Sequence, residues 1–290
     1  METSERDATL VVGAVAYDPK VVSIWEGFKS WFVKRGLAVD YVLYSNYERL
    51  VESLLAGGVD VAWNSPLAWV RARRLASSAG VEVRALAMRD TDCDLHSLIV
   101  ARADDDIRDV EDLRGRRIAV GAPDSPQATL LPLATLRSHG LEAGRDFILR
   151  TFDVLGGKHG DHVGGERDAA RALASGEVDA ACLIEGNYKQ FENENMFDPH
   201  GTSVVARTEL FDHCNFTITS ASPEELVGEF NRLLLSMSYD DPEVRPLLDL
   251  EGLRAWVPGR TELYEPLEEA VDEAGFYDKA GGITASDYRF

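Results

Sequence analysis

The sequence has few cysteines, a shortage of basic residues and no long apolar run. Cysteine occurs three times in 290 residues, at positions 93, 182 and 214, and never in a Cys-x-x-Cys pair. An odd number of cysteines, none of them at the spacing of a known motif, argues against a disulfide framework and a structural zinc knuckle. Lys and Arg number 30 against 50 Asp and Glu, so the formal net charge is −20. Because the negative electrostatic field of such a charge repels phosphate backbones and anionic lipid, we expect no nucleic-acid partner.

Two further absences concern location. No apolar stretch approaches the roughly 20 residues that span a bilayer, so we expect no membrane insertion. Residues 1–7 lack the basic segment and the apolar core of a signal peptide. The sequence as written therefore predicts a cytoplasmic protein, and an extracytoplasmic protein whose native signal was removed is the alternative.

The residues that are present predict a folded α/β protein. Hydrophobic residues make up 45% and charged residues 28% of the chain, as in globular domains. Short β-rich runs alternate with helical stretches, which is typical of crossover units in a largely parallel sheet. We expect strands at 9–15, 40–44, 59–63, 83–88, 147–152 and 178–184 and at the end of segment 112–121, with helices at 22–35, 47–56, 65–76, 127–139 and 167–175.

The two halves of this pattern resemble each other. Val12-Gly13-Ala14 recurs as Val120-Gly121-Ala122 at an offset of 108 residues. A helix-turn-strand segment ending at Asp60 recurs ending at Asp179, at an offset of 119. The larger second offset indicates an insertion, which we place in the Gly-rich segment 153–165. Open α/β sheets bind ligands at such loops after a strand, although a solvated surface loop is the alternative.

The repeat also predicts how the chain divides. If 98–101 and 203–207 are two crossings between lobes, the C-terminal segment returns to the first lobe. We therefore expect one lobe from 8–100 and 206–290 and an inserted second lobe at 101–205. The predicted fold is two-lobed, with two mixed, mostly parallel sheets joined by a two-strand hinge that closes on a ligand.

Several short segments occur in an order typical of a known family: Asn46–Leu54, Gly58–Trp63, Ser65–Val70, Ser97–Arg102, Asp112–Gly121, Ser125–Pro132 and Gly176–Ala180. The series covers about residues 9–185 and resembles the substrate-binding components of phosphate, phosphite and phosphonate ABC transporters. The resemblance implies a type II periplasmic-binding-protein-like fold. It also implies capture of a small polar, phosphonate- or phosphate-like ligand in the interlobe cleft, with a transporter permease as partner if the protein is exported.

The resemblance also implies binding residues. Tyr47, Asn64 and Ser65 would line the site from the first lobe. Ser125, Gln127 and Thr129, at the start of a second-lobe helix, would supply hydroxyl, amide and N–H donors. An ordinary N-cap is the alternative role of Ser125.

Some residues depart from the family pattern. Residues 125–129 read Ser-Pro-Gln-Ala-Thr in place of a Ser-Thr-Ser-Gly-like run, and His96 stands where an aromatic is common. Glu166 ends a loop that carries His162, and its carboxylate would repel a phosphonate unless it were protonated or bridged by a metal.

Tyr17 and Glu185 each follow a predicted strand, so they are candidate ligand contacts as well. The alternative role of Tyr17 is turn formation, and that of Glu185 is to begin the next helix.

His96, His162, Glu166 and Cys214 form a candidate metal set, because imidazole, thiolate and carboxylate together suit zinc or iron. Their spacing matches no specific metal motif, so solvated histidines and small buried thiols are the alternative.

The second functional hypothesis is a metal-dependent cytoplasmic enzyme on the same scaffold. Such an enzyme would be similar to thiamine-pyrimidine precursor synthases or menaquinone-pathway dehydratases. A cytoplasmic ligand sensor is the third. No catalytic triad, Walker loop or dinucleotide fingerprint is present, and no residue is assigned a catalytic role.

Overall fold

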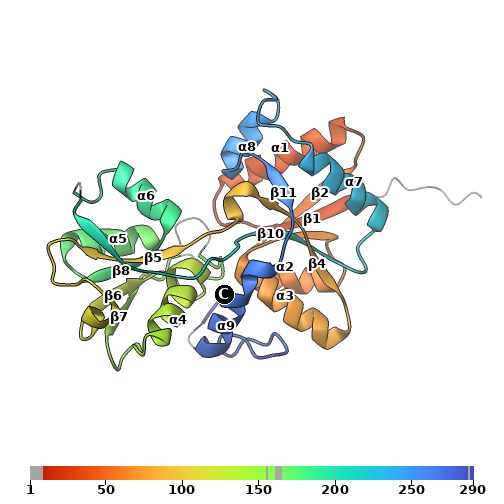
Figure 1. Ribbon diagram of the computed structural model, residues 1–290. Helices are drawn as coiled ribbons and strands as arrows, with labels where there is room; N and C mark the ends of the chain where they lie inside the picture. The colour runs from red at the N-terminus through yellow and green to blue at the C-terminus, as the bar shows by residue number, and fades with distance from the viewer. Residues whose placement is uncertain (1–8, 155, 161–164, 199, 287) are drawn as a thin grey trace, which may run out of the picture. The chain divides into compact units, whose positions relative to one another are not determined.

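The computed structural model describes residues 9–290 except 155, 161–164, 199 and 287. The chain forms two compact units (Figure 1). The first unit comprises residues 9–93, 213–262 and 279–281. The second comprises the described residues of 94–212, 263–278 and 282–290. In the described part of the chain, no helix has the length and apolar character needed to cross a membrane.

The first unit contains a six-stranded mixed sheet of order β11-β4-β10-β3-β1-β2. β1 pairs in parallel with β2 and β3, and β10 lies antiparallel between β3 and β4. β1 to β4 therefore run in one direction, against β10 and β11. The strands are β1 (Leu10–Val15), β2 (Val39–Tyr44), β3 (Val61–Asn64), β4 (Val83–Arg89), β10 (Asn215–Thr219) and β11 (Trp256–Pro258).

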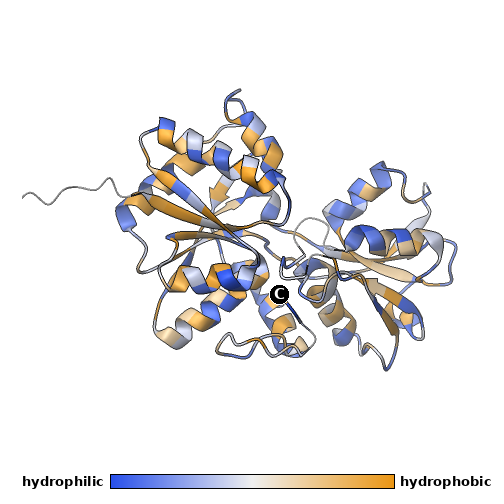
Figure 2. Ribbon diagram, turned by 180° about the vertical axis from the view of Figure 1, so that it is seen from behind, coloured by the Kyte–Doolittle hydropathy of each residue, from blue (hydrophilic) through white to orange (hydrophobic). Residues whose placement is uncertain are grey.

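Helices cover both faces of this sheet, and their hydrophobic and hydrophilic residues alternate along each helix (Figure 2). Trp63, Phe216 and Ile218 pack with α1, α7 and α8 on one face. Ala62 packs with α2 and α3 on the other. The helices are α1 (Lys20–Lys34), α2 (Tyr47–Leu55), α3 (Pro66–Ala79), η1 (Asp90–Asp92), α7 (Glu224–Leu235) and α8 (Arg245–Glu251).

The second unit contains a five-stranded mixed sheet of order β7-β6-β8-β5-β9. α5 and α6 pack on the face that carries Leu98 and Leu183, and α4 packs on the face that carries Ile99 and Ile118. The elements are β5 (Ser97–Arg102), η2 (Val110–Leu113), β6 (Arg117–Val120), η3 (Pro126–Leu130), α4 (Leu131–Ser138), β7 (Ile148–Thr151), α5 (Glu166–Ser175), β8 (Ala180–Ile184), α6 (Glu185–Asn193), β9 (Thr202–Arg207), η4 (Glu262–Tyr264) and α9 (Glu265–Ala274).

The two sheets share one strand order. β2-β1-β3-β10-β4 in the first unit corresponds to β7-β6-β8-β5-β9 in the second. In each series three parallel strands are followed by an antiparallel strand and then by a strand in the first direction. The internal repeat predicted from two short sequence matches agrees with this order. The predicted α/β class with two mixed sheets is confirmed.

The unit boundaries differ from the expected division into 8–100 with 206–290 and 101–205. The chain leaves the first unit after Cys93 and returns at His213. We expected β5 and β9 to be the crossings. They pair with each other inside the second sheet, and both faces of β5 are buried there. Residues 263–278 and 282–290 also belong to the second unit, where α9 packs against α4 and Glu273 pairs with Arg137 at 2.9 Å.

Candidate ligand-binding residues at the carboxyl edges of the two sheets

Two helices of the first unit begin at the same edge of its sheet. α2 follows β2 and α3 follows β3, and these strands run in the same direction, so both helix N-termini lie at the carboxyl edge. Asn46 caps α2 by accepting the Arg49 amide at 2.9 Å. Ser65 caps α3 by accepting the Ala68 amide at 3.1 Å. The positive ends of two helix dipoles at one edge favour an anion there.

A buried arginine fixes these two helices to each other. Arg71 of α3 donates from Nη1 to the carbonyl oxygen of Glu48 at 2.9 Å and from Nη2 to Glu52 Oε1 at 3.0 Å. Its Nε donates to the carbonyl oxygen of Gly281 at 3.2 Å. The rigid guanidinium fork thus ties the second turn of α3 to the first two turns of α2, which lowers the entropic cost of binding a ligand at the helix ends.

Three buried polar side chains lie beneath these helix ends. Asn64 Nδ2 donates to Thr217 Oγ1 at 2.9 Å, and that hydroxyl donates to Asn215 Oδ1 at 2.7 Å. Thr217 pairs with Ala62, whose side chain faces α2 and α3, so the three residues face the same helices. Asn64 Oδ1 has no hydrogen-bond partner among the described residues. A buried acceptor left unpaired costs about 1–3 kcal/mol, so this atom is suited to receive a donor.

The other two residues expected from the first lobe lie at the same edge. Tyr47 is the first residue of α2 and is fully buried. Tyr17 follows β1, is half-buried, and packs against the core beside α1. The first unit therefore brings all four of its predicted residues, including Asn64 and Ser65, to the carboxyl edge of one sheet.

The predicted donors of the second unit are buried and bonded within that unit. Ser125 caps η3 by accepting the Ala128 amide at 3.1 Å. Thr129 Oγ1 donates to the carbonyl oxygen of Ala122 at 2.8 Å. Gln127 Nε2 donates to the carbonyl oxygen of Gly160 at 2.8 Å. In this structure, each of the three side chains thus supports its own unit.

Residues 156–160 of the Gly-rich segment pack on the first turn of η3. Asp124 Oδ2 accepts the amides of Gly157 at 2.7 Å and His159 at 3.0 Å. Gly160 has φ +69°, and a Cβ added there would lie 2.3 Å from Ser125 Oγ. Burial raises the pKa of Asp124, and the electrostatic interaction with His159 and the hydrogen bonds from the two amides oppose that rise. The part of the predicted insertion that the structure describes therefore contacts its own helix start.

Glu166 is a buried acid at the start of α5. It accepts the Ile184 amide at 2.8 Å and the Gln127 side-chain amide at 3.4 Å. Burial raises the pKa of Glu166 to about 7, while hydrogen bonds from Ile184, Asn187 and Gln127 act against it. The Glu166 side chain is fully buried.

The remaining predicted contacts form ordinary pairs. His96 Nδ1 lies 2.7 Å from the carbonyl oxygen of Thr208. Glu185 accepts from Arg207 at 3.1 Å and pairs with Lys189 at 3.3 Å, and the Arg207 hydrogen bond lowers the pKa of Glu185. His162 lies outside the described residues.

The four residues predicted to bind a metal do not form one described group. His96 and Glu166 belong to the second unit and Cys214 to the first. In the described structure Cys214 instead lies beside Asp92 and His213. Asp92 and His213 were not among the four residues expected to bind a metal. Their spacing across 121 residues carries no signal until β10 pairs with β3 and β4.

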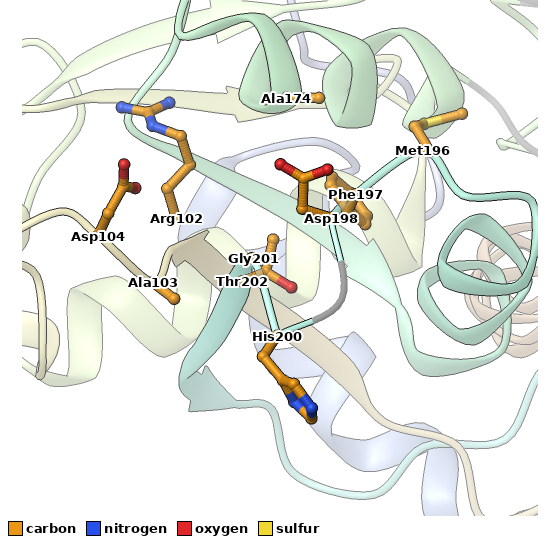
Figure 3. Close-up of a pocket in the computed structure, with 10 residues that line it drawn as sticks. All are labelled: Arg102, Ala103, Asp104, Ala174, Met196, Phe197, Asp198, His200, Gly201 and Thr202. Atoms are coloured by element: carbon orange, nitrogen blue, oxygen red, sulfur yellow. The ribbon is translucent and has the colours of Figure 1, made fainter.

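The second unit also has a pocket of about 530 Å³ away from these residues (Figure 3). Arg102, Asp104, Asp198 and His200 are among the residues that line it. Arg102 ends β5 and pairs with Thr202 at the start of β9, close to the amino end of the antiparallel β8. The Arg102 guanidinium donates to the carbonyl oxygens of Leu173 and Val178 at 3.0 and 2.6 Å. The pocket therefore lies at the edge opposite to the candidate residues.

Residues 16–264 match the family described as ABC transporter, phosphonate, periplasmic substrate-binding protein. The chain belongs to this family. As a member of the phosphonate substrate-binding family, it is 28% identical over 280 residues to the phosphate-import protein PhnD of Mycolicibacterium smegmatis, covering 90% of this chain and 81% of that protein.

Solved structures share the fold of this family member. PhnD1 from Prochlorococcus marinus in complex with methylphosphonate has a TM-score of 0.69 at 17% identity, covering 93% of this chain and 99% of that chain. The periplasmic aliphatic sulphonate binding protein SsuA from Escherichia coli has a TM-score of 0.58 at 16% identity, covering 91% and 92%. The type II periplasmic-binding-protein fold expected from the sequence is confirmed.

Family membership decides two earlier expectations. The chain is a substrate-binding protein that captures a small-molecule ligand, as predicted, and the enzyme alternative gains no support from these relatives. The expectation of a cytoplasmic protein is wrong, because the family consists of periplasmic substrate-binding proteins. That expectation depended on the residues at the start of the chain, which say nothing about the family.

Proposed function

We propose that the ligand is a small tetrahedral oxyanion of the phosphate or phosphonate type, and that the first unit supplies its principal hydrogen bonds. The observation that carries this proposal is the pair of helix N-termini, α2 and α3, held together by Arg71 at one sheet edge. The relatives support it, since one is named for phosphate import and another binds methylphosphonate. A permease of an ABC transporter is the proposed protein partner.

Each predicted residue of the first unit has a role in this proposal. The Ser65 hydroxyl donates to a ligand oxygen while it accepts the Ala68 amide. Asn64 Oδ1 accepts from a protonated ligand oxygen, and Tyr17 and Tyr47 border the ligand. The buried carboxylate of Glu48, in the first turn of α2, opposes an anion, so the dipoles of both helices are needed to outweigh it.

In the second unit we assign a supporting role to Ser125, Gln127 and Thr129, because they hold residues 156–160 and the start of η3. The carboxyl groups of Asp124 and Glu166 are buried beside the same turn and would weaken anion binding when ionised. This unit thus contributes less to oxyanion affinity than the resemblance alone implies.

Two serines allow a matched test. Ser65 and Ser125 are both fully buried, both precede a proline, and both accept an amide at 3.1 Å as N-caps. Ser65→Ala and Ser125→Ala should each lower stability by about 1 kcal/mol. Only Ser65→Ala should weaken oxyanion binding, by about 10- to 100-fold, as expected for a lost hydrogen bond to a charged group.

The measurement is calorimetric titration with methylphosphonate, phosphate, ethanesulfonate and a neutral sugar. We expect binding of an oxyanion and not of the sugar. Equal affinities in the two serine variants would contradict the assignment to the first unit. Failure of every oxyanion to bind the unmodified protein would overturn the proposed ligand class.

A further inference from the structure

Asp92, His213 and Cys214 lie together at the carboxyl edge of the first sheet. Asp92 ends η1 after β4, and His213 and Cys214 immediately precede β10. All three are buried, with exposed fractions of 1%, 8% and 1%. His213 Nδ1 is 3.1 Å from Cys214 Sγ and 3.4 Å from Asp92 Oδ1. The donor atoms all lie within 4.8 Å of one another.

We propose that these three side chains bind a divalent first-row metal ion of the zinc type. Zinc takes thiolate, imidazole and carboxylate ligands at about 2.0–2.3 Å in a tetrahedron, which separates neighbouring donors by about 3.4–3.6 Å. The separation of the Asp92 and His213 donors falls in that range. The nitrogen-sulfur distance is a few tenths of an ångström shorter, so a small rotation of His213 suffices. Three protein ligands leave a fourth position for water.

The surrounding charges suit a dication. Arg89 donates to Asp92 from Nε at 2.6 Å and from Nη2 at 2.8 Å. Its Nη1 pairs with Glu251 Oε1 at 3.3 Å. Two carboxylates and the thiolate carry three negative charges, and the guanidinium with a dication carries three positive ones. Binding therefore neutralises the group and releases the proton of the Cys214 thiol.

The Asp92–Arg89 pair is compatible with coordination. Each carboxylate oxygen has two lone pairs, and the guanidinium occupies one on each, so Asp92 keeps an acceptor site for the metal. A second partner of this kind orients a ligating carboxylate and fixes its rotamer. The site is distinct from Ser65 and the helix ends of the proposed oxyanion site, so it goes beyond the proposed function.

The ion would also connect two segments that are distant in sequence. Asp92 is the next-to-last residue before the chain leaves the first unit, and His213 is the first residue after it returns. The His213 amide already donates to the carbonyl oxygen of Asp92 at 2.8 Å. A metal bond between the side chains would therefore stabilise the first unit, by an amount that rises with the logarithm of the metal concentration above the dissociation constant.

The test uses chelator-treated full-length protein titrated with Co²⁺ and then Zn²⁺. We expect near-ultraviolet thiolate-to-cobalt absorption at one equivalent, its loss on adding zinc, and a rise in the unfolding midpoint with either metal. Cys214→Ser and His213→Gln should each abolish the absorption. Cys182→Ser and Cys93→Ser are matched controls that should retain it, since Cys182 lies in the second unit and Cys93 is outside the donor group.

Two results would overturn the site. One is the absence of cobalt absorption and of any shift in unfolding midpoint at a tenfold excess of metal. The other is absorption that survives in both Cys214→Ser and His213→Gln, because the metal would then be bound elsewhere. If one of these variants fails to fold, the other still decides the outcome.

Discussion

The carbonyl oxygen of Gly160 accepts a 2.8 Å hydrogen bond from the side-chain amide of Gln127. This contact joins the Gly-rich segment to the first turn of η3, where the family resemblance implies ligand donors. A glycine is needed for it, because Gly160 has a positive φ and lies against the Ser125 side chain. Residues 156–160 are thus an integral part of the second unit.

Gly160→Ala should destabilise the protein by about 2–3 kcal/mol, since the added methyl meets Ser125 and φ is +69°. Gly144→Ala is the control, with φ +78° and nothing within 4 Å of the added methyl. That control should lose only about 1 kcal/mol, the cost of the backbone conformation. Urea unfolding followed by circular dichroism measures both. Equal losses of stability in the two variants would show that the Ser125 side chain can change position at little energetic cost.

Glu166 should make stability depend on pH. Its folded-state pKa of about 7 lies above the ordinary value of 4.5, so the folded protein holds the proton longer than the unfolded chain. The contribution of Glu166 to the free energy of unfolding is therefore fully present below about pH 4.5. It is lost as the pH rises to about 7, which lowers the free energy of unfolding by about 3 kcal/mol. Glu166→Gln should remove this fall. Asp168→Asn, in the same helix turn and partly exposed, should leave it in place. Unfolding curves between pH 4.5 and 8.5 would test this, and parallel pH profiles for Glu166→Gln and the unmodified protein would contradict it.

Arg71→Lys should cost about 2 kcal/mol of stability, because an ammonium group cannot replace three directed guanidinium contacts. It should also weaken oxyanion binding, since α3 loses the arginine contacts that tie it to the start of α2. Arg73→Lys is the control on the exposed face of the same helix. Titration calorimetry and thermal unfolding report the two effects. A stability loss with unchanged affinity would separate Arg71 from ligand binding.

Asn64→Ala should lower oxyanion affinity by about tenfold if Asn64 Oδ1 accepts from the ligand. Asn231→Ala is the matched control, because Asn231 Oδ1 also has no hydrogen-bond partner among the described residues and lies on α7. The control should bind the oxyanion as the unmodified protein does. Affinity unchanged in Asn64→Ala would mean that the ligand does not reach this acceptor.

The sequence predicts much of the fold and part of the site. Alternating strand and helix patterns predict both sheets, because each crossover unit is local in sequence. The first-unit residues Asn64 and Ser65 follow β3 directly, so their place at a sheet edge can be read from the pattern. The packing of residues 156–160 against Ser125 cannot be read from the pattern, since it depends on a contact between Gly160 and Ser125, which are 35 residues apart.

The sequence pattern predicts neither the unit boundaries nor the meeting of Asp92 with His213, for a related reason. β5 has the same apolar character as a connecting strand, and only its partners β8 and β9 make it an inner strand of the sheet. Asp92 meets His213 only after β10 inserts between β3 and β4. Non-local pairings of this kind leave no periodic signal.

The position of β10 sets an order of completion during synthesis. β3 and β4 are made early, but the strand that joins them begins at Asn215, after every strand of the second sheet has been made. The nascent first unit therefore carries two open strand edges while the second sheet can already form. Exposed edges of this kind can pair with other chains, so until Thr219 emerges from the ribosome the nascent first unit has a liability to aggregate that a chaperone would reduce.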